Sequence, residues 1–148
     1  MRTSFIVCVA AALTIALSTG LRGQGGASAD HPIVWSASDL KWTDNPAIKG
    51  ARQAVLWGDP AKEAYGALKS VPAGTALAAH THSTLTRFVV ISGTLEFGID
   101  GGQPRSLGPQ AYGSIPAGVK HSARCQSGSP CVYFETAPAA YDLKPAAF

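Results

Sequence analysis

The stretch AAHTHSTLTRFVVISG, residues 78–93, holds two histidines one residue apart, followed by an apolar run that ends at a glycine. Residues two apart on a β-strand point to the same face, so His80 and His82 direct their rings the same way, about 7 Å apart along the strand. Such rings can bind one cation if the strand twists. The stretch therefore suggests a metal site carried by a β-strand.

The sequence around this stretch predicts short strands separated by turns. Gly, Pro and Asp interrupt the apolar segments, and no window keeps a 3.6-residue apolar period for more than two turns. The segments DGG and SGSP are typical of hairpin connections. This pattern predicts an all-β sandwich or barrel. The predicted strands are IVWSASDLKW (a first strand and turn), ARQAVLWG, AYGALKSV, ALAAHTH, RFVVIS, TLEFGID, PRSL, AYGSI, VKHSARC and CVYFETA.

A third histidine belongs to the same hypothesis. His121 lies in PAGVKHSARC, where Pro-Ala-Gly predicts a turn immediately before a strand. Three imidazoles from two strands suit Zn, Fe, Ni, Cu or Mn and leave open positions for water or substrate.

These residues resemble the two sequence motifs of the cupins. Gly74, five residues, HTH, three residues, Thr86, six residues and Gly93 resemble the first motif, and PAGVKHSARC resembles the second. The resemblance covers about the middle third of the chain. It implies a double-stranded β-helix, or jelly roll, with His80, His82 and His121 as ligands of a divalent transition metal. The sequence of the two motifs is similar to that of small exported cupins without an assigned biochemical role.

Two positions depart from the cupin pattern. Thr86 stands where the first motif usually has a glutamate ligand, and Cys125 stands where the second usually ends in asparagine. A threonine hydroxyl is a poor ligand for first-row metals. What remains is a three-histidine site, which some cupin dioxygenases use with iron. Water, a substrate oxygen or a carboxylate from elsewhere would complete it. The alternative is a cupin that has lost its metal and keeps only a pocket.

Four further residues are pocket candidates. Thr86 shares strand parity with the histidines unless STLT turns the chain there, and Tyr112 is an expected core or pocket-lining aromatic residue. Arg87 points to the other face, either in a surface or dimer-interface salt bridge or as a clamp for a substrate anion. Cys125 shares parity with His121 and could be a thiolate ligand. We favour a Cys125–Cys131 disulfide, because an even cysteine pair in an exported protein suggests one.

Glu96 is a candidate for the replacement ligand. Glu96 lies in TLEFGID, between Leu95 and Phe97. Alternation along a strand turns it away from the face of those two apolar residues, which favours a solvated position.

The first residues predict an exported protein. Met1 and Arg2 precede FIVCVAAALTIALS, an apolar run of fourteen residues, and small residues follow. This is typical of a signal peptide with cleavage after Gly20 or Ala29, whereas the run is short for a membrane anchor, the alternative. Residues 1–29 are then signal peptide and flexible leader, and residues 30–148 form a single domain.

The net charge of the chain bears on which partners are expected. Loss of the leader removes two arginines and lowers the formal charge from +3 to about +1, which gives no argument for nucleic acid or membrane as a partner. The expected partner is a small organic molecule, and a homodimer is left open. The hypothesis is a metal-dependent enzyme of the oxygenase or isomerase type. The alternative is a non-catalytic module that binds or senses metal or a small ligand.

Overall fold

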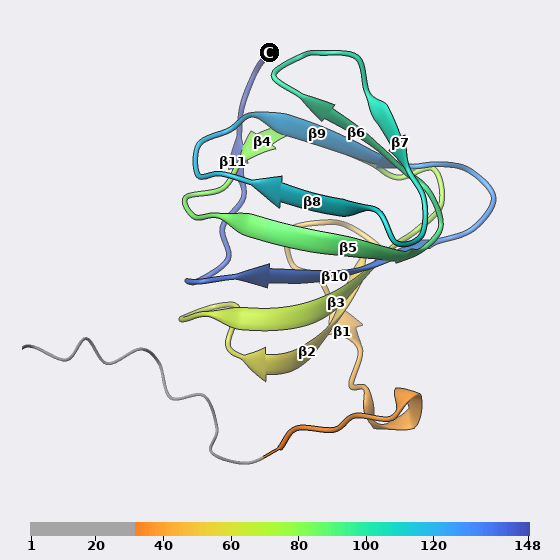
Figure 1. The fold of residues 1–148 in the computed structure, drawn as a ribbon, viewed down its shortest axis with the longest axis vertical. Coiled ribbons are helices and arrows are strands. Elements are labelled where there is room, and N and C mark those ends of the chain that lie inside the picture. The colour runs from red at the N-terminus through yellow and green to blue at the C-terminus, as the bar shows by residue number, and fades with distance from the viewer. Residues whose placement is uncertain (1–31) are drawn as a thin grey trace, which may run out of the picture.

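Two antiparallel β-sheets packed face to face make up the fold (Figure 1). The computed structural model of the protein describes residues 32–148. These sheets confirm the predicted all-β class, while the predicted leader lies outside the described residues. In the described part of the chain, no helix is both long and apolar enough to cross a membrane.

The first sheet has six strands and the second has five. In spatial order the first contains β1 (Thr43–Asp44), β2 (Arg52–Gly58), β3 (Tyr65–Val71), β10 (Cys131–Ala137), β5 (Thr86–Ser92) and β8 (Tyr112–Ile115). The second contains β11 (Lys144–Pro145), β4 (Ala76–Thr81), β9 (His121–Cys125), β6 (Leu95–Ile99) and β7 (Arg105–Leu107).

The chain passes from one sheet to the other at most of its turns. At the β5–β6 crossing, Gly93 has a φ of 76°, and a Cβ there would lie 2.7 Å from the Pro130 carbonyl oxygen, so the turn requires glycine. DGG joins β6 and β7 as a hairpin, as predicted. The prediction for SGSP was wrong, because β9 and β10, which it connects, belong to different sheets.

The predicted first strand at residues 33–42 is also absent from the structure. A short 3₁₀ helix, Ala37–Asp39, occupies part of it, and strand pairing begins only at β1. The carboxylate of Asp39 accepts hydrogen bonds from the backbone N–H and the hydroxyl of Ser36, at 2.9 and 2.6 Å. These local bonds favour a turn of helix over an extended chain.

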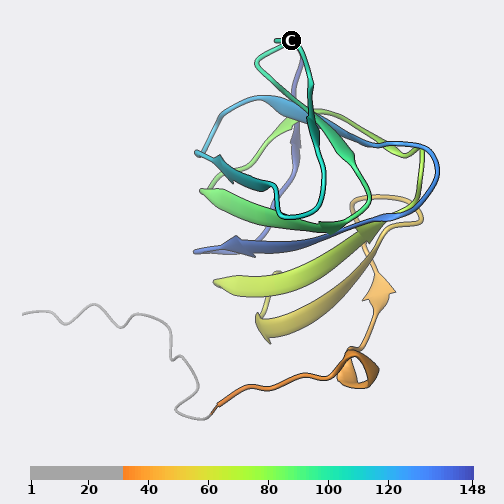
Figure 2. The same ribbon diagram turned by 45° about the vertical axis from the view of Figure 1, so that its right-hand side comes forward.

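The core lies between the inner faces of the two sheets. Its buried side chains are Ala51, Val71, Phe88, Val90, Leu95, Ile115, Cys125, Cys131 and Tyr133. The predicted Cys125–Cys131 disulfide is present and joins β9 to β10, which lie in different sheets. The C terminus ends beside the β6–β7 turn, where Phe148 would contact a Cβ placed on Gly101 (Figure 2).

A candidate metal centre

Three histidines converge at one end of the core. His80 is in β4, His82 directly follows that strand, and His121 opens β9, where it pairs with His80. One ring nitrogen of each lies within 4.8 Å of the others, and ring centroids are 4.2 to 5.1 Å apart. All three side chains are buried. The structure thus brings together the three residues that the cupin resemblance singled out.

An extra residue in β4 places Leu77 on the same side of the strand as His80. The β4–β9 register shifts between Leu77 and His80, as a β-bulge produces. The bulge changes the parity of the strand, so that Leu77 and His80, three residues apart, both face the cavity.

Backbone carbonyls hold each ring in one orientation. Nδ1 of His80 donates to the Ala78 carbonyl at 2.7 Å, and Nδ1 of His121 donates to the Val119 carbonyl at 3.0 Å. His82 donates in the same way to the carbonyl of Asp142. Since a carbonyl can only accept, these bonds assign the proton to Nδ1 and leave Nε2 with a free lone pair. Outer hydrogen bonds of this kind orient histidine ligands in metal proteins.

Burial keeps His80 and His121 neutral. It lowers the pKa of His121 to about 4, against the opposing effect of the hydrogen bond to Val119 and with a smaller contribution from the neighbouring histidines. Burial likewise lowers the pKa of His80. Both rings are therefore unprotonated near neutral pH, the state in which imidazole binds a metal.

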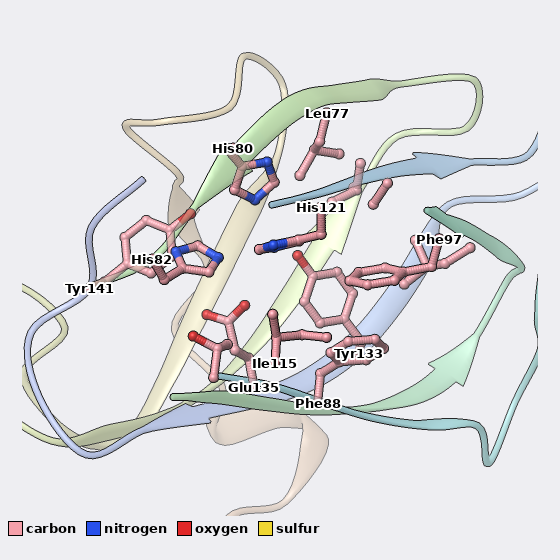
Figure 3. A pocket seen from close by; sticks show the side chains of 14 residues that line it. Leu77, His80, His82, Phe88, Phe97, Ile115, His121, Tyr133, Glu135 and Tyr141 are labelled. Carbon is pink, nitrogen blue, oxygen red and sulfur yellow. The ribbon is translucent and has the colours of Figure 1, made fainter. Parts of the chain in front are cut away.

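A buried carboxylate faces the histidines from the other sheet. Glu135 of β10 is 7% exposed and lines the same cavity, and its carboxylate points toward the histidine side of the pocket (Figure 3). Tyr65 donates its hydroxyl proton to Oε1 of Glu135 at 2.7 Å, and Nζ of Lys69 lies 3.6 Å from the same oxygen. Lys69 also donates to Oε1 of Gln53 at 2.9 Å.

The sequence reading missed Glu135, although a signal was present. In CVYFETA, alternation places Cys131, Tyr133 and Glu135 on one face, and all three are buried. Its partner Tyr65 stays a neutral donor, because burial and then the Glu135 carboxylate raise the pKa of its hydroxyl.

The segment after β10 closes one side of the site. The ring of Tyr141 lies 5.5 Å from that of His82, and the side chain of Asp142 accepts a hydrogen bond from the backbone N–H of Ser83 at 2.8 Å. Burial raises the pKa of Tyr141, with a smaller effect from Glu135. These residues, too, were not recognised from the sequence.

The cavity is small and mostly apolar. Its volume is about 40 Å³, enough for about three water molecules. The lining residues are Val71, Leu77, His80, His82, Thr86, Phe88, Leu95, Phe97, Ile115, His121, Ala123, Tyr133, Glu135 and Tyr141.

Of the four pocket candidates, only Thr86 lines this cavity. It does so from β5 in the opposite sheet, because the chain turns at residues 83–85, so the parity argument that linked it to the histidines does not apply. Arg87 is exposed, and Tyr112 is 59% exposed, on the outward face of edge strand β8. Cys125 is bonded to Cys131 and offers no thiolate. Glu96 lies outside the cavity beside Gln126, as expected.

Comparison with known proteins identifies related folds. A family model described as a domain of unknown function, DUF4437, matches residues 24–144. No curated protein matches the chain. Among solved structures, the polyketide cyclase RemF from Streptomyces resistomycificus has a TM-score of 0.65 and 20% identity, over 78% of this chain and 85% of the cyclase.

Two further structures are similar at the same level. An RmlC-like cupin from Shewanella frigidimarina has a TM-score of 0.60 and 18% identity, over 74% of this chain and 93% of that one. An uncharacterised protein with a double-stranded β-helix domain from Klebsiella pneumoniae has a TM-score of 0.60 and 17% identity, over 78% and 100%. The shared feature is the fold, a cupin double-stranded β-helix, as the sequence resemblance implied.

Proposed function

The chain belongs to the DUF4437 family of unknown function and has a cupin fold, so we propose its function from its own site. We propose that His80, His82 and His121 bind a divalent transition metal. In this proposal the protein is a metal-dependent enzyme of the oxygenase or isomerase type. Its substrate in this proposal is a small organic molecule.

The observation that carries the proposal is the arrangement of the three imidazoles. Each Nδ1 donates to a backbone carbonyl, so Nε2 is the free nitrogen of each ring, and the three rings share one buried position. Imidazole nitrogens fit Fe, Zn, Mn, Ni and Cu. When bound, such a metal supplies Lewis-acid polarisation of a substrate oxygen, or electron transfer if it is redox-active.

The chain's own residues supply the remainder of the site. Phe88, Phe97 and Ile115 line the cavity with apolar surface and keep bulk water away from the histidines. The buried carboxylate of Glu135 lies across the cavity and offers an acceptor for a substrate hydrogen. The structurally similar polyketide cyclase is an enzyme by its name. This similarity supports catalysis by a protein of this fold but does not indicate a particular reaction.

A second candidate is a non-catalytic module that binds or senses metal or a small ligand. Two observations favour it: the cavity measures only about 40 Å³, and Thr86 replaces the glutamate ligand of the first cupin motif.

Elemental analysis of protein purified from its native compartment tests the proposal. We expect about one equivalent of transition metal per chain. Iron or another redox metal would favour an oxygenase, and zinc would favour an isomerase or a binding module. A protein that carries no metal natively and takes up none on addition would contradict the proposal.

We also propose that the protein is exported, with residues 1–29 as signal peptide and leader. The disulfide supports this, because cysteine pairs persist in oxidising compartments. Fractionation of the producing cells tests it; mature protein found in the cytoplasm with its leader intact would contradict it.

The sequence leaves a homodimer open, and we propose the surface on which one would form. Val89 and Ile91 on β5 and Tyr112 on β8 are exposed on the outward face of the six-stranded sheet, and this is the surface that a second copy would cover. Sedimentation velocity tests it, and a monomer at all concentrations would contradict it.

A further inference from the structure

Resting on the metal site proposed above, we propose that Glu135 determines the charge of the ligand that this site accepts. The ligand is a small neutral or cationic molecule that carries an O–H or N–H group beside its metal-binding atom. Small anions are disfavoured.

Glu135 lies across the cavity from the histidines. It belongs to β10 in the six-stranded sheet, whereas the histidines belong to β4, the residue after it and β9 in the five-stranded sheet. Both sets of side chains point into the same cavity (Figure 3). Among residues 32–148, no carboxylate oxygen joins the group of histidine nitrogens that lie within 4.8 Å of one another. Glu135 therefore faces the position where a ligand would sit and is not a fourth member of the cluster.

One of its two oxygens is fixed and the other is open to the cavity. Oε1 receives the Tyr65 hydroxyl and lies near Lys69. Within the described chain, Oε2 accepts no hydrogen bond from another residue. Every fully buried side-chain nitrogen or oxygen of the described residues has a hydrogen-bond partner, so Oε2 is not fully buried. Oε2 is therefore accessible from the cavity, where it can accept a hydrogen bond from a ligand.

The buried ion pair is oriented with its negative end toward the ligand. Lys69 is 3% exposed, packs with its Nζ 4.5 Å from the centroid of the Tyr141 ring, and does not line the cavity. No Lys or Arg of the described residues is among the lining residues. An anion in the cavity would lie closer to the Glu135 carboxylate than to the Lys69 ammonium, and in a buried site this repulsion is weakly screened.

Azide binding to the Co²⁺-loaded protein tests the proposal, since azide is a small anion and its binding changes the visible spectrum of cobalt. We expect Glu135→Gln to tighten azide binding by about tenfold or more, because it removes a negative charge that faces the ligand in a weakly screened site. Glu96→Gln is the matched control: it removes the same charge from a side chain outside the cavity and should leave azide affinity at the wild-type value.

A double variant guards against loss of folding. Glu135→Gln alone leaves the Lys69 charge buried without its partner, which destabilises a core. Lys69→Met combined with Glu135→Gln removes both charges, and its azide affinity should lie between those of wild type and Glu135→Gln. Azide affinity equal to wild type in both folded variants would overturn the proposal.

The Co²⁺ affinities of the same proteins distinguish failure of the proposed role of Glu135 from failure of the proposed metal site. We expect Glu135→Gln to weaken Co²⁺ binding by less than about 100-fold, because it removes a negative charge that faces the cation without touching it. A loss well beyond about 100-fold would make Glu135 a metal ligand and overturn its role toward ligand charge, while the metal site itself would stand. Wild-type protein that binds no Co²⁺ would instead refute the proposed metal site.

Discussion

At the residue scale, two side chains of this site are held by partners far away in the sequence. The Nδ1 proton of His82 is bound by the carbonyl of Asp142, 60 positions later, and Glu135 is bound by Tyr65, 70 positions earlier. His82 and Glu135 are therefore positioned by the complete fold before any ligand arrives, and the cost of ordering them is met during folding.

The vacant ligand position of the first motif can be filled by Thr86→Glu. Thr86 is 5% exposed and lines the cavity, so a carboxylate there should reach the histidine nitrogens. We expect divalent metal binding about tenfold tighter, or about 1.4 kcal/mol, by chelator competition. Repulsion from Glu135 on the adjacent strand limits the gain. Thr86→Gln, of equal size without charge, is the control. An unchanged affinity in a folded variant would mean that residue 86 does not reach the site.

The histidine pKa values predict acid sensitivity of the metal-free protein. In the unfolded chain these histidines titrate near about 6.5, whereas burial lowers the pKa of His121 to about 4 and also lowers that of His80. On acidification the unfolded state binds protons first. The stabilising contribution of the neutral rings is therefore complete above about pH 6.5 and is lost as the pH falls toward about 4.

Urea denaturation of metal-free protein between pH 7 and pH 4 measures this effect. The unfolding free energy should fall more steeply for wild type than for His121→Gln, which lacks one of the titrating groups. Parallel pH curves for the two proteins would refute the assignment of His121 as a buried neutral histidine.

At the element scale, β4 and β10 carry most of the chemistry. The bulge of β4 turns both Leu77 and His80 toward one cavity, and β10 alternates strictly, with every second residue buried. The outward residues of edge strand β8 follow the same rule, which places Tyr112 in solvent. Whether a side chain belongs to the site therefore depends first on which face of its strand carries it.

Sequence patterns were sufficient for nine strands and for the histidine triad, because turn residues and motif spacing are local signals. They failed where position depends on pairing between distant segments. Glu135 lies outside both cupin motifs, and the segment containing Tyr141 has no periodicity that would indicate its packing on His82. Residues 33–42 have strand-like composition, but the Ser36–Asp39 bonds bend them into a helical turn.

The C-terminal segment makes an element-scale prediction. Removal of residues 141–148 deletes β11, which pairs with β4, together with the carbonyl that orients His82. We expect metal affinity to fall by about 10- to 100-fold, the usual effect of losing an outer hydrogen-bond partner. Removal of residues 147–148 alone is the control and should leave affinity near wild type. A protein that keeps full affinity without residues 141–148 would show that this segment does not support the site.

At the scale of the whole molecule, the two sheets are joined covalently as well as by the core. The Cys125–Cys131 disulfide closes a loop with a sequence separation of six residues and connects the sheets within the core. Closing so short a loop stabilises by about 2.4 kcal/mol in the chain-entropy model.

Reduction should therefore lower the unfolding free energy of wild type by about 2 kcal/mol in urea titrations. The Cys125→Ala, Cys131→Ala double variant should not respond to reductant, which controls for other effects of the reagent. Metal affinity should stay unchanged in both, because neither sulfur lines the cavity. Loss of metal binding on reduction would show that the site depends on the disulfide.

The central claim is that one buried metal site is formed by His80, His82 and His121. Titration of purified protein with a divalent transition metal, with His80→Ala, His82→Ala and His121→Ala in parallel, tests it most directly. We expect one equivalent bound by wild type and a loss of affinity in each variant beyond the roughly 100-fold upper effect of outer partners. If all three variants bind a full equivalent as tightly as wild type, these histidines do not form the metal site.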